Sequence, residues 1–312
     1  MPEILISTSS FDVENNPALA DLRAAGYTLR GNPHGRRLNE AEIAALLTTE
    51  TVGLIAGLEP LTADVLAGAP ALRVISRCGI GLDNVDLDAA IRCGIRVVNT
   101  PDAPVASVAE LTLALMLACL RQLPEADRQM RAGAWPRLEG GLLGARTVGL
   151  IGCGRIGRRV AALCSAFGAQ VLVYDPAVME LPAMTERVDL DTLLARADLV
   201  SLHAPALPGL TPLIGAAALA RLPRGAIVIN TARGSLIDLT ALAQALDDGH
   251  IAAAGLDTFE PEPYHGQLCA YPQVVLSPHL GSAARETRRR MEQEAAANLA
   301  AALRAHDDGP AP

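Results

Sequence analysis

The sequence predicts an α/β protein with two domains, each built on a parallel sheet. Short apolar runs typical of strands alternate with helical patterns along the chain, which favours parallel sheets. A glycine-rich turn of the dinucleotide-binding kind occurs once, at residues 152–157. At 312 residues the chain is also long for a single hydrophobic core. We therefore expect a dinucleotide-binding domain and a second, smaller α/β domain that lacks this turn.

In the first domain, the β runs are residues 4–7, 53–56, 73–76 and 96–99. The helical patterns between them cover residues 17–26, 40–48, 62–67 and 88–93. Pro101 and Pro104 forbid helix continuation, so they mark the crossing into the next domain. The first domain is predicted to span residues 1–100.

In the second domain, residues 101–282, the expected strands are 148–151, 170–174, 199–203, 226–230, 252–256 and 274–276. Residues 105–123 predict a helix that is apolar on nearly every side, which protein must cover everywhere. It could buttress the two domains or form a subunit interface. Residues 283–304 predict a terminal helix that packs back on the first domain, which makes that domain discontinuous (1–100 plus 283–312), with a frayed tail from 307 to 312.

The composition excludes several classes of function. A formal charge of −8 argues against a nucleic-acid or anionic-membrane surface. The first residues lack a basic segment, so they predict a strand and no signal peptide. The longest apolar run, residues 111–120, is too short to cross a bilayer. We expect a soluble cytoplasmic protein with no membrane or nucleic-acid partner.

The cysteines show no metal-ligand or disulfide pattern. Neither Cys-x-x-Cys nor a Cys/His ligand spacing occurs, so no metal site is predicted. We expect buried free thiols, which suit a reducing cytosol. The six are Cys78, Cys93, Cys119, Cys153, Cys164 and Cys269.

The glycine-rich turn lies between the apolar run 148–151 and the amphipathic segment 158–167. Gly152 permits the tight turn, Gly154 lets the backbone approach a pyrophosphate, and Gly157 lets helix and strand pack closely. The helix N-terminus adds N–H donors and a partial positive charge. This context predicts that the domain binds a dinucleotide.

The next β run, residues 170–174, ends at Asp175. A carboxylate there can accept both ribose hydroxyls of NAD and would repel the extra phosphate of NADP. No arginine immediately follows Asp175 and Pro176. The sequence therefore predicts NAD as the cofactor.

Three polar residues, Arg233, Glu262 and His279, follow predicted strands of the second domain. Each alone has a structural explanation: a surface charge, a helix start and a satisfied core polar group. Together they suit reduction of a 2-keto acid. Histidine can give a proton to the carbonyl oxygen near neutral pH, and a carboxylate beside the imidazole orients it and favours its protonated form. Arginine can hold the substrate carboxylate and polarise the carbonyl.

The sequence resembles the NAD-dependent D-isomer-specific 2-hydroxyacid dehydrogenase family over nearly its whole length, with features of the D-3-phosphoglycerate dehydrogenase-like branch. The resemblance rests on motifs that occur in order along the chain. They are Arg77-Cys-Gly79-Ile-Gly81-Leu-Asp-Asn84-Val-Asp86, Gly152-Cys-Gly-Arg-Ile-Gly157, Tyr174-Asp175-Pro176, His203-Ala-Pro205, Asn230-Thr-Ala-Arg233-Gly234, Gly255-Leu-Asp257 with Glu260-Pro-Glu262-Pro263, and Ser277-Pro-His279-Leu-Gly281.

The resemblance implies two Rossmann-like domains with the active site in the interdomain cleft, and a homodimer with the helix from Val105 at its interface. It implies that His279 is the proton donor, Glu262 its partner and Arg233 the substrate anchor. The implied substrate contacts are Arg77, Cys78, Gly79, Arg233 and His279. The implied cofactor contacts are Gly152, Gly154, Arg155, Ile156, Gly157, Asp175, Ala204, Thr231, Ala232, Arg233, Asp257, His279 and Gly281.

The substrate stays open between 3-phosphoglycerate, glycerate/hydroxypyruvate and other D-2-hydroxy acids. Arg77 and Trp135 match the phosphoglycerate-type branch, but a second arginine often found there is absent from the loop that contains Glu59. Glu59 would repel a phosphate if it faced the cleft. The physiological direction, the choice between dimer and tetramer, and binding of a phosphate by Arg77 also stay open.

Two other functions are compatible with parts of the sequence. Formate dehydrogenase is disfavoured, because that branch lacks a glutamate partner for its histidine, whereas this chain has Glu262. The alternative from another class is a non-catalytic NAD-sensing protein, like the corepressors that share the fold. Such proteins keep a similar triad, so the site residues alone do not separate them from the enzymes.

Overall fold

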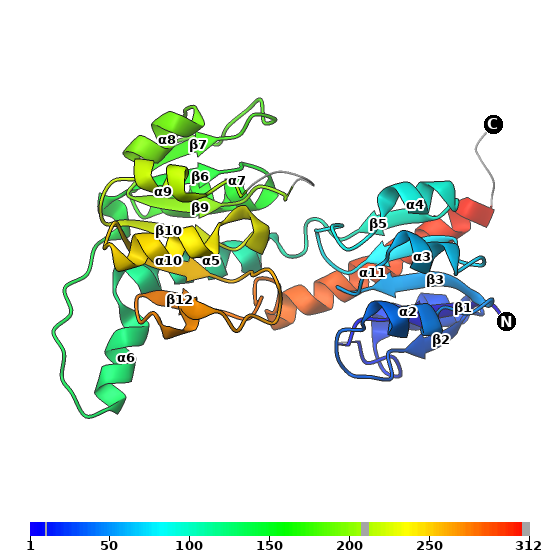
Figure 1. The fold of residues 1–312 in the computed structure, drawn as a ribbon. Helices are drawn as coiled ribbons and strands as arrows, with labels where there is room; N and C mark the ends of the chain where they lie inside the picture. Colours follow the sequence, from blue (N-terminus) through cyan, green and yellow to red (C-terminus); the bar gives the residue numbers. More distant parts are fainter. Residues whose placement is uncertain (10, 207–211, 308–312) are drawn as a thin grey trace. The chain divides into compact units, whose positions relative to one another are not determined.

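The computed structural model describes residues 1–9, 11–206 and 212–307. The chain forms two compact units, which are described separately (Figure 1). Unit 1 comprises Met1–Pro104 and Arg285–Pro312, and unit 2 comprises Val105–Ala284. Of the tail expected at the C-terminus, residues 308–312 lie outside the described part of the chain.

Unit 1 is built on a parallel sheet of five strands in the order β2-β1-β3-β4-β5. Side chains alternate between its faces, so Ile4 and Ile6 enter one apolar core and Leu5 enters the other. Both faces are covered by helices, as an all-parallel sheet requires. The strands are β1 (Glu3–Ile6), β2 (Thr28–Gly31), β3 (Thr51–Ala56), β4 (Val74–Arg77) and β5 (Arg96–Asn99).

The helices of unit 1 divide between those two cores. The first core contains side chains of η1 (Pro17–Leu19), α1 (Ala20–Ala24) and the terminal α11 (Arg285–Asp307). The second contains side chains of α2 (Glu40–Leu46), α3 (Ala63–Ala67) and α4 (Leu87–Arg92). The hydroxyl of Ser76 donates to the carbonyl of Ala295 over 2.8 Å, which ties α11 to β4. The last helix of the chain therefore packs on the first sheet.

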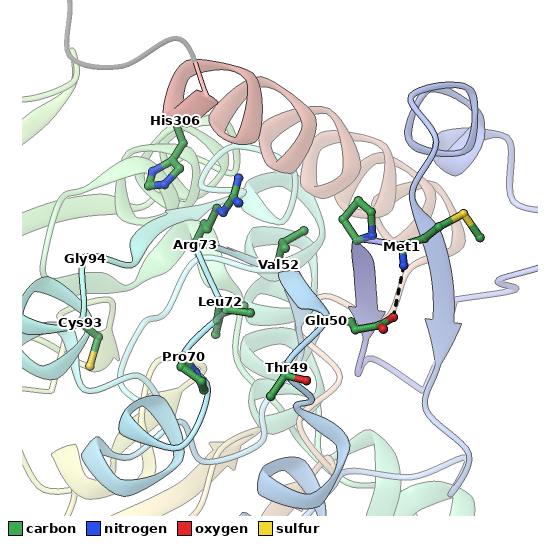
Figure 2. Close-up of a pocket in the computed structure, with 12 residues that line it drawn as sticks. Met1, Thr49, Glu50, Val52, Pro70, Leu72, Arg73, Cys93, Gly94 and His306 are labelled. Carbon is green, nitrogen blue, oxygen red and sulfur yellow. Dashed lines mark hydrogen bonds and ion pairs between the residues drawn. The ribbon is translucent and has the colours of Figure 1, made fainter.

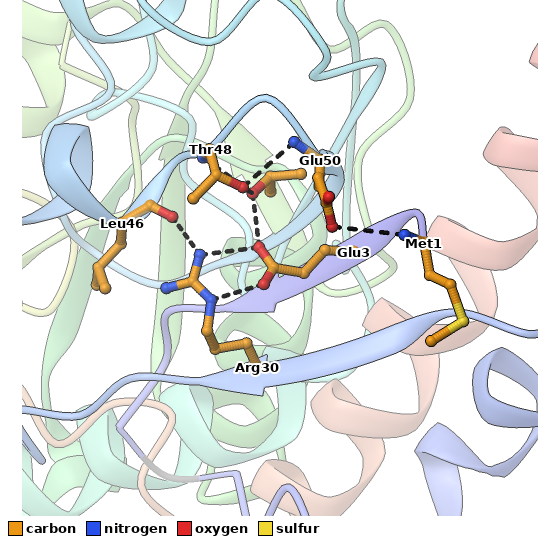
Figure 3. A network of polar contacts seen from close by, with 7 residues as sticks. Met1, Glu3, Arg30, Leu46, Thr48 and Glu50 are labelled. Carbon is orange, nitrogen blue, oxygen red and sulfur yellow. Dashed lines mark hydrogen bonds and ion pairs between the residues drawn. The ribbon is translucent and has the colours of Figure 1, made fainter.

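An open pocket of about 660 Å³ lies at the amino ends of the strands of unit 1 (Figure 2). Its lining includes Glu50, Arg73 and His306, and none of the residues that the sequence assigns to a site. A polar network lies at the same edge (Figure 3): Arg30 donates to both carboxylate oxygens of Glu3 over 2.7 and 2.8 Å, and these bonds hold the pKa of Glu3 below its usual value. Ligands of open parallel sheets gather at the opposite, carboxyl edge.

Unit 2 has a seven-stranded parallel sheet in the order β12-β11-β10-β9-β6-β7-β8. The chain passes outward from β6 to β8 and then returns to β9, on the other side of β6. The loops after β6 and β9 therefore flank the topological switch point. The strands are β6 (Thr147–Ile151), β7 (Gln170–Tyr174), β8 (Thr185–Arg187), β9 (Leu199–Leu202), β10 (Ala226–Asn230), β11 (Ile251–Leu256) and β12 (Val274–Leu276).

Helices cover both faces of this sheet as well. One core contains side chains of α5 (Val105–Leu120) and α7 (Arg155–Ala166). The other contains side chains of α8 (Leu190–Arg196), α9 (Ala216–Arg221) and α10 (Leu239–Asp247). Short 3-10 helices lie at η2 (Leu143–Ala145), η3 (Gly234–Leu236) and η4 (Gln267–Ala270). The predicted α/β class with two parallel sheets is confirmed.

The long helix predicted over residues 105–123 is wrong at its end. α5 ends at Leu120, and α6 (Leu123–Arg131) follows with Pro124 in its first turn. Gln122 adopts a φ of 48°, which breaks the helix between them. Within this chain α5 is not covered on every side, because Ala106, Glu110 and Ala114 are exposed, so complete cover of this helix stays a prediction that requires a subunit interface.

Two further expectations concern the burial of the cysteines and the length of the apolar helices. Cys93 and Cys269 are exposed, so the prediction of buried thiols holds only for the other four cysteines. Among the described residues, no single helix is long and apolar enough to cross a membrane. The pair α5 and α6, bent by 62°, passes such a test on length and composition only.

Candidate active site

The site residues predicted in unit 2 all follow strands of its sheet. Because the strands are parallel, their carboxyl ends lie at one edge. The glycine-rich loop follows β6, Asp175 follows β7, and Ala204 follows β9. The loops after the next three strands contain the remaining residues: Thr231, Ala232, Arg233, Asp257, Glu262, His279 and Gly281.

The glycines of the loop after β6 are required by close contacts. Gly152 has a φ of 98°, and a Cβ there would lie 2.6 Å from the carbonyl carbon of His203. A Cβ on Gly157 would lie 2.3 Å from the carbonyl oxygen of Gly152. By contrast, a Cβ on Gly154 would meet nothing within 4 Å. Gly154 also begins α7 without a side-chain cap, so backbone next to open space precedes the helix N-terminus.

Asp175 joins the end of β7 to the glycine-rich loop. One carboxylate oxygen accepts the N–H of Cys153 over 2.7 Å, and the other accepts those of Ala177 and Val178 over 2.8 and 3.0 Å. Burial alone would raise the pKa of Asp175, but these backbone bonds and the nearby Arg187 lower it below its usual value. The carboxylate is therefore ionised and fixed beside the loop.

His203 lies beneath the same loop. Its backbone contacts Gly152, and its Nε2 lies 2.9 Å from the hydroxyl of Ser201, which is buried. Burial lowers the pKa of His203 to about 4. At neutral pH this imidazole is therefore uncharged. It packs beneath the loop and does not offer a positive charge to a phosphate.

His279 and Glu262 form a pair at the ends of β12 and β11. Nδ1 of His279 lies 3.1 Å from each carboxylate oxygen of Glu262. The two side chains are 34 % and 25 % exposed, so solvent or a ligand can reach the imidazole. Glu262 is itself held by the N–H of Phe259 over 3.1 Å. A carboxylate at Nδ1 leaves Nε2 as the nitrogen available for proton transfer.

Asp257 holds the loop that contains His279. Its carboxylate accepts the hydroxyl of Ser277 over 2.5 Å and the N–H groups of Leu280 and Gly281 over 2.7 and 2.9 Å. Asp257 is 1 % exposed, and its carbonyl oxygen also accepts the N–H of His279 over 2.8 Å. His279 has a φ of 56°, a left-handed conformation that costs energy in a residue with a Cβ. These bonds stabilise it.

The turn after β10 positions Arg233. The side chain of the buried Asn230 donates to the carbonyl of Arg233 over 2.8 Å and accepts the N–H of Ala232 over 3.0 Å. A Cβ on Gly234 would lie 2.2 Å from the carbonyl carbon of Phe259. The turn that contains Arg233 therefore packs against the loop that leads to Glu262, and the three catalytic candidates share one edge of the sheet.

Unit 1 presents the other predicted residues at the end of β4. The N–H of Cys78 donates to the carbonyl of Ala56 over 2.8 Å, and that of Gly79 to the carbonyl of Arg77 over 3.0 Å. A substrate carboxylate would have to compete for these two donors. Glu59, which was expected to repel a phosphate if it faced the cleft, is only 1 % exposed, so within this unit its side chain does not face open solvent.

Sequence reasoning did not assign a site role to Asn230 or Ser277. The role of Asn230 could have been found from the sequence, since the side chain of an asparagine before a turn often forms a hydrogen bond with the backbone of the residue two positions later. Ser277 carried no such signal, because its partner Asp257 is on a different loop. Among the described residues, no group of three or more histidine, cysteine or acidic side chains could hold a metal ion.

Residues 113–281 match the family model described as "D-isomer specific 2-hydroxyacid dehydrogenase, NAD binding domain". The chain is 45 % identical over 256 residues to a D-3-phosphoglycerate dehydrogenase of Mycobacterium leprae, covering 80 % of this chain and 48 % of that protein. It is 40 % identical over 260 residues to a hydroxypyruvate reductase of Thermotoga maritima, covering 81 % and 85 %.

Among solved structures, a D-lactate dehydrogenase from Aquifex aeolicus complexed with NAD and lactic acid has a TM-score of 0.85 and 26 % identity, covering 96 % of this chain and 95 % of that one. The chain spans about half the length, 48 %, of the mycobacterial relatives that it matches.

Proposed function

The chain belongs to the D-isomer specific 2-hydroxyacid dehydrogenases, and we propose that it interconverts a D-2-hydroxy acid and its 2-keto acid with NAD as the hydride carrier. The observation that carries this proposal is the His279–Glu262 pair next to the turn of Arg233. A proton donor, its orienting carboxylate and a cation for the substrate lie at one sheet edge, as the reaction requires.

In the proposed reduction, Nε2 of His279 gives a proton to the carbonyl oxygen of the keto acid. Glu262 holds the imidazole through Nδ1, so that Nε2 points away from the carboxylate. Arg233 binds the substrate carboxylate and stabilises negative charge on the carbonyl oxygen. Arg77, Cys78 and Gly79 of unit 1 are proposed as further substrate contacts. In the reverse direction, His279 takes the proton from the hydroxyl group.

The residues present fit a dinucleotide. The space over Gly154, the uncapped N-terminus of α7 and the fixed carboxylate of Asp175 suit a pyrophosphate followed by a ribose. When bound, the cofactor supplies the hydride or accepts it. We propose that Arg155 and Ile156 lie against the pyrophosphate. The further proposed contacts are Gly152, Gly157, Ala204, Thr231, Ala232, Arg233, Asp257, His279 and Gly281.

A keto-acid screen tests the function. NADH oxidation is measured with glyoxylate, pyruvate, hydroxypyruvate, phosphohydroxypyruvate and bulkier 2-keto acids. The proposal expects saturable turnover with at least one of them. Tight NADH binding without turnover on any of them would favour the NAD-sensing alternative.

Replacing Asp175 by alanine is expected to narrow the preference for NAD over NADP. The variant loses the acceptor for the ribose hydroxyls and the charge that repels a 2′-phosphate, so the ratio of kcat/KM values should shift by about tenfold or more. The measurement is steady-state kinetics with both reduced cofactors. Asp191→Ala, which removes an exposed carboxylate of the same unit, is the matched control. Equal use of both cofactors by the unmodified protein would contradict the role given to Asp175.

We also propose that the protein is a homodimer. The segment from α5 to residue 142 exposes large apolar side chains: Trp135 is 80 % exposed, Leu142 70 % and Leu123 62 %. Exposed apolar groups gathered in one segment are typical of an interface. A cytoplasmic location is proposed on the six free cysteines, two of which are exposed.

Replacing Trp135 by alanine is expected to weaken self-association by about tenfold or more in Kd, because buried tryptophans dominate interface energies. Sedimentation over a range of concentrations measures this. Ile91→Ala, at an apolar residue of α4 that is 74 % exposed, should leave the equilibrium unchanged. A wild type that sediments as a monomer at every concentration would refute the proposed dimer.

A further inference from the structure

The loop that begins at Asp175 has an irregular backbone. Residues 175–184 form neither helix nor strand, and they lead from β7 into the edge strand β8. Val178 and Leu181 pack against the core that contains α7, whereas Met179 between them is 91 % exposed. An irregular surface loop of this kind keeps one conformation when polar contacts hold its backbone.

Arg187 makes such contacts with the first half of the loop. One terminal nitrogen of its guanidinium donates to the carbonyl of Asp175 over 3.1 Å. The other donates to the carbonyls of Val178 and Met179 over 2.7 and 3.0 Å. A guanidinium carries five N–H donors in a fixed planar geometry, so one side chain can bond to several carbonyls at once. Arg187 therefore closes the loop from Asp175 to Met179.

The register of the sheet places Arg187 beside this loop. It is the last residue of β8 and pairs with Val173 of β7, whose side chain lies in the core with α7. Paired residues of neighbouring strands point to the same face of a sheet, so Arg187 extends on the side of α7. On that side Arg158 of α7 donates to the carbonyl of Glu180. Two arginines on one face therefore bond to the backbone of the loop.

The conformation of this loop determines where the carboxylate of Asp175 lies. The N–H groups of Ala177 and Val178, which bond to that carboxylate, belong to the stretch that Arg187 closes. Burial, the largest influence on the pKa of Asp175, raises it; the backbone N–H groups lower it, and the charge of Arg187 lowers it least. Contacts with the backbone, more than charge, therefore connect Arg187 to Asp175.

We propose that Arg187 is a positioning residue for the cofactor, which holds the loop after β7 so that the carboxylate of Asp175 is in place for the adenosine ribose before NAD binds. The inference rests on the proposed function, in which Asp175 accepts the ribose hydroxyls. A loop that is ordered beforehand does not have to be ordered on binding, which raises affinity. Arg187 takes no part in hydride or proton transfer.

The test measures the Kd for NADH by fluorescence and kcat at saturating NADH, both in the full chain. Arg187→Gln is expected to raise the Kd by about tenfold and not to lower kcat, because binding must then order the loop. Arg187→Lys keeps the charge but loses the planar fork of donors, so it should raise the Kd nearly as much. ADP-ribose, which contains the adenosine ribose and lacks the nicotinamide, should weaken as an inhibitor by the same factor.

Arg196→Gln is the matched control. Arg196 lies on α8 and donates to Glu186 of β8 over 2.6 Å, so this variant removes one positive charge next to the same strand and leaves the bonds of Arg187 in place. Its Kd for NADH should equal that of the wild type.

Three results would overturn the proposal: wild-type affinity for NADH in Arg187→Gln, wild-type affinity in Arg187→Lys beside a loss in Arg187→Gln, or the same loss in the control. The second and third would attribute the effect to charge and not to the loop. Absence of both NADH binding and NADH oxidation in the unmodified protein would instead overturn the proposed function itself.

Discussion

Replacing His279 by asparagine is expected to lower kcat/KM for the best keto acid by about 10² to 10⁴, the usual cost of removing a positioned proton donor. Asparagine tolerates the left-handed backbone that His279 adopts at a φ of 56°, so the loop should keep its conformation. Alanine should give a similar loss and add some backbone strain. Steady-state kinetics with NADH measure the effect.

Two controls separate chemistry from folding in this variant. The thermal unfolding temperature should stay close to that of the wild type, and NADH affinity, measured by fluorescence, should fall far less than kcat/KM, because His279 is one of many proposed cofactor contacts. A His279→Asn or His279→Ala protein that keeps wild-type turnover on its best substrate would show that the role given to His279 is wrong.

Replacing Asp257 by alanine should damage both stability and turnover. The change leaves the hydroxyl of Ser277 and the N–H groups of Leu280 and Gly281 without their acceptor. Buried donors that lose a partner cost about 1 to 3 kcal/mol each and do not add simply, so we expect a loss of about 2 to 5 kcal/mol in the free energy of unfolding. Displacement of the His279 loop by about 1 Å should lower kcat by about 10²-fold.

Urea unfolding and kcat measured on the same preparations test this prediction. Ser277→Ala removes one donor and keeps the carboxylate, so it should cost less than Asp257→Ala in both measurements. Besides being a proposed cofactor contact, Asp257 is a positioning residue in this account, because its bonds hold the loop on which His279 lies. An Asp257→Ala protein with the stability and the kcat of the wild type would show that Asp257 does not have this role.

The sheet could be predicted where its strands are buried on both faces. The inner strands of both units are mostly apolar runs, and the expected β7 and β10 agree with the structure residue for residue. The edge strands β5 and β12, which also contain valine pairs, agree with their expected ranges as well. The short edge strands β2 and β8 were not predicted. β2 is Thr-Leu-Arg-Gly with no buried residue, and β8 is Thr-Glu-Arg. Such strands depend on a neighbour for their formation more than on their own pattern.

The candidate site also has a part that could be predicted from the sequence and a part that could not. Strand ends and residue chemistry were enough to suggest that His279, Glu262 and Arg233 work together, because parallel strands place their carboxyl ends at one edge. The partners of Asp257 could not be predicted, because the hydroxyl of Ser277 and the N–H groups of Leu280 and Gly281 reach it only in the observed conformation of residues 277–281. Glu59 required the structure for the same reason: its burial follows from the fold of the loop after β3.

The stereochemistry and stoichiometry of the reaction test the central claim most directly. The purified protein is incubated with NADH and its best 2-keto acid, and the product is resolved by chiral chromatography while NADH consumption is followed. We expect one D-2-hydroxy acid formed for each NADH oxidised, and loss of both signals together in His279→Asn. Formation of the L isomer, or NADH consumption without a hydroxy acid product, would contradict the account.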